Sequence, residues 1–261
     1  MLLAIAIGST NIRIAVFEGR QPLVQTSMRA DTLILPDEYA VKIQSALQLF
    51  GCDPAEIDGV ILSSVMPPLV SVMRQAVARL TGARMLVVGP GLKTGLHIRI
   101  NDPGQLGSDL VVCAVAALGR YKPPLLVCSM GTATTMVAID REGAVRGGAI
   151  MPGVKISLDA LAEHTAQLPR IDLERPPRDV IGLNTVDCMK SGILYGTAST
   201  IEGMAARMEE SLGEEAQLVA TGSYAPAIAP LCRRPLVIDE DLMMEGLRMI
   251  YNKNSKGQTD K

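Results

Sequence analysis

The sequence predicts an α/β protein of two lobes, each headed by a strand, a glycine turn and a second strand. The chain has 261 residues, which is enough for two lobes that each bury a core of their own. Hydrophobic residues make up 48% of it and charged residues 20%, a composition typical of globular rather than disordered proteins. The strand–turn–strand pattern occurs twice, beginning at Leu2 and again at Leu125.

The first lobe begins with an apolar strand over 2–7, a polar GSTN turn and a second strand over 12–17. Apolar periodicity and turn residues then predict, in chain order, helix 36–50, strand 59–63, helix 68–80, strand 84–88 and helix 107–121. We expect residues 1–115 to form this lobe.

The second lobe follows a KPP segment and opens with strand 125–129 and the MGTATT turn. Its later elements are strand 218–221, a helical stretch around Ala225 and a final helix over 240–251, whose methionines have the spacing of a core-facing stripe. We expect residues 116–252 to form this lobe and residues 253–261 to form a polar tail.

The two strand–turn–strand units align at a constant offset of 123 residues, which places Gly8 on Gly131 and Ala6 on Ser129. Two such units heading two α/β lobes are what an actin-like, or ribonuclease H-like, fold requires, because its nucleotide lies in the cleft between the two hairpins. Actin, Hsp70 chaperones and sugar kinases share this duplicated fold. The alternative is a pair of unrelated hairpins, since glycine turns between apolar strands are common.

Charge and composition exclude several kinds of partner. The net charge is −2 and the basic residues are scattered, so no basic stripe is available for nucleic acid, and aromatic residues for base stacking make up only 3%. The five cysteines are widely spaced without a CxxC pair, which predicts reduced core thiols and no cysteine–histidine metal site. The first apolar run stops at Gly8, too short to cross a bilayer. We therefore expect a cytoplasmic protein without a membrane or nucleic-acid partner.

The two glycine turns are candidate phosphate-binding sites. Each offers backbone N–H groups and short polar side chains at a place where a phosphate can approach the backbone closely. Taken alone, each turn is also explained as a plain hairpin turn that uses the usual glycine and asparagine. The candidate residues are Gly8, Ser9, Thr10 and Asn11 in the first turn and Gly131, Thr132 and Thr134 in the second.

Asp109 is the candidate general base, and it falls at the start of helix 107–121. A carboxylate that faces the γ-phosphate in a cleft can accept the proton of an attacking hydroxyl. A carboxylate at the same place can instead cap the helix or complement its positive end. The GGAIMPG segment over 147–153 has a similar pair of explanations, because it either presents N–H groups to an anion or is only a strand-to-helix turn.

The order of the motifs along the chain is specific. It runs GSTN at 8, SSVMPPL at 63, GPGLKTGL at 89, DPxxxGxD at 102, MGTATT at 130, GGAIMPG at 147, HTAQLP at 164 and IGLNT at 181. Over nearly the whole chain the sequence resembles a type III pantothenate kinase. The resemblance implies a homodimer of actin-like subunits that phosphorylates pantothenate with ATP, Mg²⁺ and usually a monovalent cation, K⁺ or NH₄⁺, in the first step of coenzyme A synthesis.

The resemblance also implies roles for individual residues. Asp109 matches the family's catalytic base, and Gly107 matches the residue beside the pantothenate. Thr185 matches a residue contributed across the dimer interface. The GSTN and MGTATT turns match the phosphate-binding turns.

Several charged positions of the family are replaced. The family has aspartates, at the metal-facing ends of the repeated strands, where this chain has Ala6 and Ser129. It has an arginine next to its base where this chain has Leu110. Further replacements are Ile100 for a tyrosine, Gln105 for a glutamate and Ser223 for a glycine.

These replacements leave two hypotheses about activity. One is a pantothenate kinase that uses Asp109 and whose metal is carried by other groups and by the ATP itself. The other is a non-catalytic family member, either a partner subunit of a competent paralogue in a heterodimer or a ligand-sensing regulator. Ala6, Ser129 and Leu110 favour the second, because the triphosphate charge is less neutralised without the carboxylates and the substrate loses an anchor.

Overall fold

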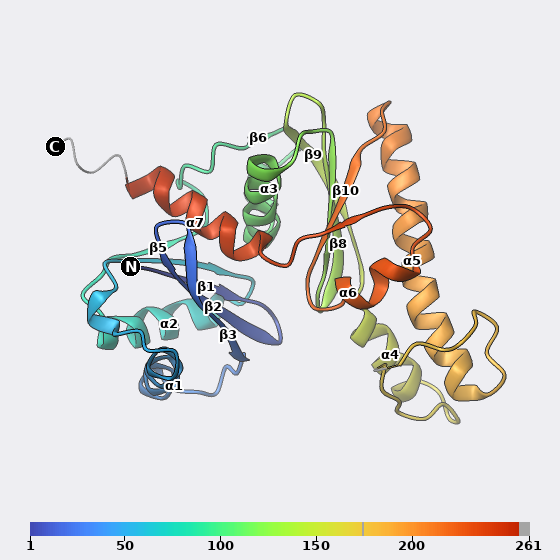
Figure 1. The fold of residues 1–261 in the computed structure, drawn as a ribbon, viewed down its shortest axis with the longest axis horizontal. Coiled ribbons are helices and arrows are strands. Elements are labelled where there is room, and N and C mark those ends of the chain that lie inside the picture. The colour runs from blue at the N-terminus through green and yellow to red at the C-terminus, as the bar shows by residue number, and fades with distance from the viewer. Residues whose placement is uncertain (174, 256–261) are drawn as a thin grey trace. The chain divides into compact units, whose positions relative to one another are not determined.

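The computed structural model describes residues 1–173 and 175–255 (Figure 1), which group into two compact units. Unit 1 comprises Met1–Leu96, Asn101–Gly119 and the chain from Asp241, and unit 2 comprises His97–Ile100 and Arg120–Glu240. The sequence places the C-terminal helix in the second lobe, whereas α7 (Leu242–Ser255) packs within unit 1. The end of the predicted polar tail, residues 256–261, lies outside the described residues.

Unit 1 is built on a five-stranded sheet in the order β3-β2-β1-β4-β5. Strands β1, β2 and β3 form an antiparallel meander, and β1, β4 and β5 are parallel to one another. The strands are β1 (Leu2–Ile7), β2 (Asn11–Glu18), β3 (Gln21–Arg29), β4 (Gly59–Ser64) and β5 (Met85–Val87). The helices of this unit, besides α7, are α1 (Pro36–Leu49), α2 (Pro67–Leu80) and α3 (Ser108–Arg120), with short 3₁₀ turns at Pro54–Glu56 and Pro103–Gln105.

Helices cover both faces of this sheet, and β1 shows why. Its odd-numbered side chains, such as Leu3 and Ile5, pack in the core formed with α1 and α2. Its even-numbered side chains, such as Ala4 and Ala6, pack in the core formed with α3 and α7. Successive side chains of a strand point to opposite faces, so a strand buried on both faces is apolar at every position. The continuous apolar run from Leu2 to Ile7 is therefore a central strand.

Unit 2 repeats the strand arrangement of unit 1. Its sheet has the order β11-β10-β7-β8-β9-β6, with β7, β8 and β9 antiparallel and β7, β10 and β11 parallel. The strands are β6 (His97–Ile98), β7 (Leu125–Met130), β8 (Ala133–Ile139), β9 (Ala144–Pro152), β10 (Gln217–Thr221) and β11 (Val237–Ile238). Strand β7 starts and ends 123 residues after β1, so the repeat predicted from the sequence is confirmed in topology as well as in register.

Helices α4, α5 and α6 bury one face of the second sheet. Their bounds are α4 (Val154–Glu163), α5 (Thr185–Leu212) and α6 (Ala225–Ile228), and a 3₁₀ turn follows at Ala229–Leu231. Asn184 caps the N-terminus of α5, where its side chain accepts a hydrogen bond of 2.9 Å from the Asp187 N–H, and Gly213 caps the C-terminus with a left-handed φ of 75°. Apolar periodicity and turn residues did not predict this helix.

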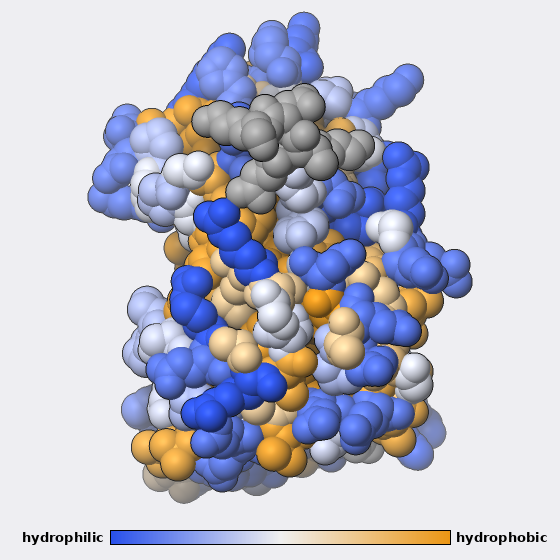
Figure 2. Space-filling model, turned by 90° about the vertical axis from the view of Figure 1, so that its left-hand side faces the viewer, coloured by the Kyte–Doolittle hydropathy of each residue, from blue (hydrophilic) through white to orange (hydrophobic). Residues whose placement is uncertain are grey.

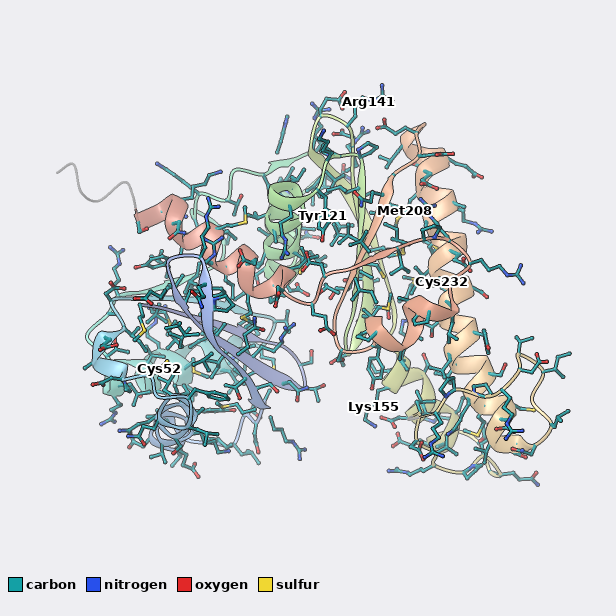
Figure 3. The ribbon with its side chains drawn as sticks, viewed as in Figure 1. Cys52, Tyr121, Arg141, Lys155, Met208 and Cys232 are labelled. Atoms are coloured by element: carbon teal, nitrogen blue, oxygen red, sulfur yellow. The ribbon has the colours of Figure 1, made fainter. Side chains whose placement is uncertain are left out.

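Asp239 is buried in unit 2 between two donors. Arg120 Nη1 donates to its Oδ1 over 3.1 Å, and the hydroxyl of Tyr121, which is labelled in Figure 3, donates to its Oδ2 over 2.8 Å. Burial, together with the hydrogen bond to Asp239, raises the pKa of Tyr121 to about 12. The phenol therefore stays protonated and keeps donating at physiological pH.

The cysteines are free thiols, and the expectation that they are core residues holds for three of them. Cys52, Cys113 and Cys128 are buried, Cys232 is half-buried, and Cys188, in the first turn of α5, is exposed. No helix in the described part of the chain is long and apolar enough to cross a membrane. Figure 2 shows hydrophilic residues interspersed with hydrophobic ones on one face of the molecule.

We expect the Glu209–Arg234 pair to make unit 2 acid-sensitive. Arg234 Nη1 donates to Glu209 Oε2 over 2.6 Å, and this guanidinium holds the pKa of Glu209 below its ordinary value of 4.5. The pair's contribution is complete above that value and is lost as pH falls through the lowered folded-state pKa. Glu209→Gln should cost about 1.5–3 kcal/mol at neutral pH, the strength of a charge-assisted hydrogen bond, and less in acid.

Thermal melts between about pH 3 and pH 7 measure this effect. Glu210→Gln is the matched control, because Glu210 is exposed and adjacent on α5. A difference between Glu209→Gln and the unaltered chain that does not shrink in acid would contradict the assignment.

Candidate functional site

The first predicted phosphate turn connects β1 to β2 in unit 1. The Gly8 N–H donates to the Asn11 carbonyl over 2.9 Å, which closes the turn, and the side chains of Ser9, Thr10 and Asn11 are exposed. A Cβ atom at Gly8 would lie 3.2 Å from the Asn11 carbonyl oxygen, so this turn has little room for a side chain there. The turn thus presents backbone and hydroxyl groups at its outer side, as a phosphate-binding turn requires.

The equivalent turn of unit 2 connects β7 to β8 and is supported from behind by glycines. The Gly131 N–H donates to the Ala133 carbonyl over 3.1 Å. A Cβ atom on Gly153, at the start of α4, would lie 2.1 Å from the Thr132 carbonyl oxygen. Gly222 packs as closely, since its Cβ would lie 2.5 Å from the Met130 carbonyl oxygen. Close packing against the turn therefore explains why position 153, the end of the GGAIMPG segment, is a glycine.

Three hydroxyl residues lie in one row across the second sheet. Ser129 on β7 is in register with Thr135 on β8 and with Thr221 on β10. The Oγ1 atoms of Thr135 and Thr221 are buried and have no hydrogen-bond partner in the described structure. Thr134, which precedes Thr135 on β8, is 2% exposed, and its Oγ1 atom is likewise buried without a hydrogen-bond partner among the described residues. Such groups mark sites where a further polar atom is expected.

Asp109 is the second residue of α3 and is half-buried. A Cβ atom on Gly107 would lie 2.6 Å from Asp109 Oδ1, so the carboxylate folds back over this glycine, with Leu110 Cγ at 3.7 Å from the same point. Just before it, Gln105 Nε2 donates to Asp102 Oδ2 over 2.9 Å, a bond that a glutamate at 105 could not make. The replacement of the family's glutamate is thus accommodated locally.

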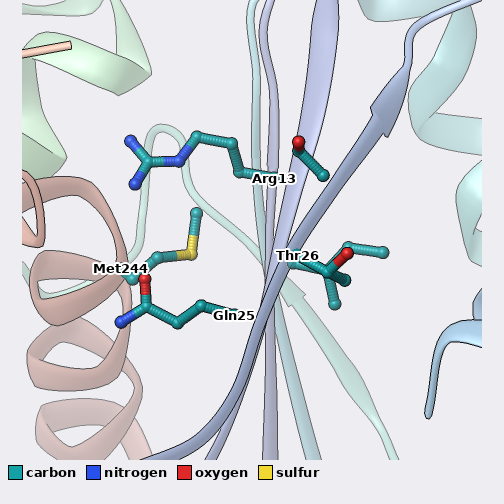
Figure 4. Close-up of a pocket in the computed structure, with 6 residues that line it drawn as sticks. Arg13, Gln25, Thr26 and Met244 are labelled. Atoms are coloured by element: carbon teal, nitrogen blue, oxygen red, sulfur yellow. The ribbon is translucent and has the colours of Figure 1, made fainter. Parts of the chain in front are cut away.

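Ala6 lies at the end of β1 beside residues that the sequence analysis did not single out. It is in register with Arg13 on β2 and with Ser63 on β4. Arg13 and Met244 line a hollow of about 220 Å³ together with Ile14, Gln25, Thr26 and Ser27 (Figure 4). The glycine turns and Asp109 do not line this hollow.

Comparison with known proteins decides the family. The model of the type III pantothenate kinase family matches residues 2–207. A type III pantothenate kinase of Moorella thermoacetica is 42% identical over 98% of this chain and 100% of its own length, and one of Myxococcus xanthus is 40% identical over 97% and 99%.

The chain belongs to the type III pantothenate kinase family.

Solved structures support the actin-like fold, with its two α/β lobes, that the sequence predicts. The activator of 2-hydroxyisocaproyl-CoA dehydratase from Clostridium difficile, solved with bound ADPNP, matches with a TM-score of 0.58, 10% identity and coverage of 100% of this chain and 97% of its own. Component A of the (R)-2-hydroxyglutaryl-CoA dehydratase of Acidaminococcus fermentans matches with a TM-score of 0.59, 12% identity and 99% coverage of each chain. At these identities the likeness concerns the fold alone.

The residues at the two strand ends do not fit a carboxylate-held divalent cation. Divalent magnesium takes oxygen ligands and is usually anchored by one or two carboxylates. Ala6 offers none, and Ser129 offers a neutral hydroxyl. In the described part of the chain, no group of three or more His, Cys, Asp or Glu side chains is placed to hold a metal ion. Ala6 and Ser129 therefore supply no carboxylate for a metal ion at the two strand ends.

The structure brings the predicted site residues together in groups. Gly8, Ser9, Thr10 and Asn11 share one turn, Gly107 and Asp109 share the start of α3, and Gly131 and Thr132 share the equivalent turn of unit 2. Thr185 stands apart, as the exposed first residue of α5. Sequence patterns gave no role to four hydroxyl residues of these regions, for which the signal was only a hydroxyl beside a glycine turn or at a strand end: Ser63, Ser108, Thr135 and Thr221.

Proposed function

We propose that this chain phosphorylates pantothenate with ATP. The observation that carries the proposal is Asp109, which matches the family's base and lies in the first turn of α3 with its carboxylate over Gly107. Membership in the family over nearly the full length supports the substrate class. The proposal extends to a dimer in which Thr185 of one subunit contributes to the substrate site of the other.

In the proposed reaction, the hydroxyl oxygen of pantothenate attacks the γ-phosphorus of ATP, and Asp109 accepts the proton of that hydroxyl. The new oxygen–phosphorus bond forms while the bond from the γ-phosphorus to the bridging oxygen breaks, and ADP leaves. In this proposal the N–H groups and hydroxyls of the glycine turns contact phosphate oxygens, and Gly107 leaves the space into which the Asp109 carboxylate folds. Positioning and electrostatic stabilisation account for most of the catalysis of phosphoryl transfer.

The direct test is ADP formation by the purified chain with ATP, Mg²⁺ and pantothenate, together with detection of phosphopantothenate. Turnover that requires pantothenate supports the proposal. ADP formation that is independent of pantothenate, or no turnover over a range of K⁺ and NH₄⁺ concentrations, contradicts it.

A second function is favoured by Ala6 and Ser129. These residues occupy equivalent positions in the repeat, so the same carboxylate is missing from both units. A non-catalytic partner subunit, or a ligand sensor, accounts for that symmetry. A chain that is silent alone but raises the activity of a family member that has both aspartates would support the partner role.

We expect the double substitution Ala6→Asp and Ser129→Asp to restore Mg²⁺-dependent nucleotide binding. Ala6 is 7% exposed, so an aspartate there is costly to ionise until a cation or the neighbouring Arg13 compensates it. The thermal stability of the variant should therefore be lower than that of the unaltered chain without ligand and should rise more with MgATP. If carboxylates are the limiting defect, turnover rises about tenfold or more.

The matched control is Ala6→Asn with Ser129→Asn, which has nearly the same shape but no charge. The comparison is made by thermal melts with and without MgATP and by the ADP assay. If the asparagine variant gained as much thermal stability with MgATP and as much turnover as the aspartate variant, then the size of the side chains, and not their charge, would limit nucleotide binding.

A further inference from the structure

Three serine groups connect the start of α3 to the end of β4. Ser63 Oγ donates to Ser108 Oγ over 2.9 Å, and Ser108 Oγ donates to the Ser64 carbonyl over 3.1 Å. Ser108 thus uses both its acceptor and its single proton, and the direction of the chain of bonds is fixed. Ser63 is 2% exposed, so water cannot replace Ser108 as its partner without rearrangement.

This chain of hydrogen bonds holds the residue that precedes Asp109. Ser108 is the first residue of α3, and Gly107 accepts the first helical hydrogen bond, from the Val111 N–H over 3.0 Å. Asp109 folds its carboxylate back toward Gly107, where a Cβ atom would lie 2.6 Å from its Oδ1. The backbone before and after Asp109 is therefore fixed by specific contacts, and the missing side chain at 107 leaves the space that the carboxylate occupies.

We propose that Ser63 and Ser108 are positioning residues for Asp109. The proposal rests on the proposed function, in which Asp109 is the general base. In this role the serines act through the backbone: they fix the first turn of α3 on the end of β4, and this fixes the direction of the Asp109 carboxylate. A displacement of about 1 Å at a catalytic group can cost about 100-fold in rate.

Ser63 also lies in register with Ala6 on β1. Its hydroxyl is thus in the strand-end row from which the family's carboxylate is missing, and it is tied directly to the turn that carries the base. The end of β4 is thus linked through neutral hydroxyls to Ser108, the residue that precedes Asp109.

The activity arm of the test uses Ser108→Ala in two backgrounds. In the unaltered chain, Ser108→Ala should lower kcat about tenfold with little change in KM, because orientation and not binding is lost. In the Asp109→Asn background, the same substitution should have no further effect on the residual rate. Ser108→Thr, which keeps the hydroxyl, should retain most of the activity, and Ser71→Ala, an exposed serine of α2, is the control for serine loss.

The structural arm measures amide hydrogen exchange and does not depend on turnover. Ser108→Ala and Ser63→Ala should each accelerate exchange at the Val111 amide at least tenfold, and Ser71→Ala should not. Unchanged exchange overturns the proposal, as does an equal loss of rate in both backgrounds. Absence of turnover in the unaltered chain refutes the proposed function, and the positioning proposal is then decided by exchange alone.

Discussion

Replacing Asp109 by asparagine is expected to lower kcat for pantothenate phosphorylation by about 10²–10⁴-fold, the usual contribution of a general base. Asparagine has nearly the same shape and keeps the contacts over Gly107, but it cannot accept the proton of the attacking hydroxyl. Nucleotide binding should be unchanged, because the phosphate turns belong to other segments of the chain. The measurements are steady-state kinetics and nucleotide titration of the same preparation.

The competing explanation of Asp109 is a helix-terminal charge, and a matched substitution separates the two. Asp37 is the second residue of α1, as Asp109 is of α3, and it pairs with Arg79 at 3.0 Å on the surface. Asp37→Asn therefore removes a carboxylate at the same helical position, at a cost of no more than about 1 kcal/mol of stability. Equal, small effects of both substitutions would assign Asp109 to the helix end and remove it from the mechanism.

Replacing Gly153 by alanine is expected to destabilise unit 2 by about 3 kcal/mol, the upper part of the usual range for overpacking. The new methyl would lie 2.1 Å from the Thr132 carbonyl oxygen and 2.5 Å from that of Gly131. Both are backbone atoms of a turn held between two strands, so they cannot move aside as a flexible side chain would. The variant should also bind nucleotide more weakly, because the same displacement distorts the predicted phosphate turn.

Gly192→Ala supplies the control for the loss of a glycine. Gly192 lies in α5 and is exposed, and among the described residues no atom beyond its chain neighbours and the nearby backbone of its own helix lies within 4 Å of the position its Cβ would take. Alanine there should stabilise the helix by about 0.5–1 kcal/mol, since it restricts the unfolded backbone. Denaturant unfolding of both variants gives the comparison. A Gly153→Ala variant as stable as the unaltered chain would show that α4 and the turn can separate at no cost.

Hydrophobic pattern and turn residues were sufficient to predict the strands that position the two glycine turns. The repeat from Leu2 and from Leu125 predicted equivalent hairpins, and the two sheets confirm it because the same strand order follows each of them. Local signals were not sufficient for α5. Its glycines and threonines lower helix propensity, whereas its apolar side chains, such as Ile193 and Ile201, pack on the second sheet and stabilise the helix through tertiary contacts.

The site was predicted only in part, for a related reason. Asp109 and the glycine turns are recognisable because chemistry restricts the residue types at those places. Ser63 and Ser108 are common residues, separated by 45 positions in the chain, and only the packing of α3 against β4 brings their hydroxyls to 2.9 Å. The pairing of Ala6 with Arg13 likewise depends on strand register, which sequence does not state.

The sequence by itself determined the duplicated α/β architecture, the candidate base and the absence of carboxylates at Ala6 and Ser129, because periodicity and residue identity are properties of short segments. Only the tertiary structure decided that α7 completes the core of unit 1, that Gly153 supports the second glycine turn, and that two serines hold the helix of Asp109. Those features depend on atoms far apart in the chain that burial forces into contact, and contact of that kind is fixed by the fold as a whole.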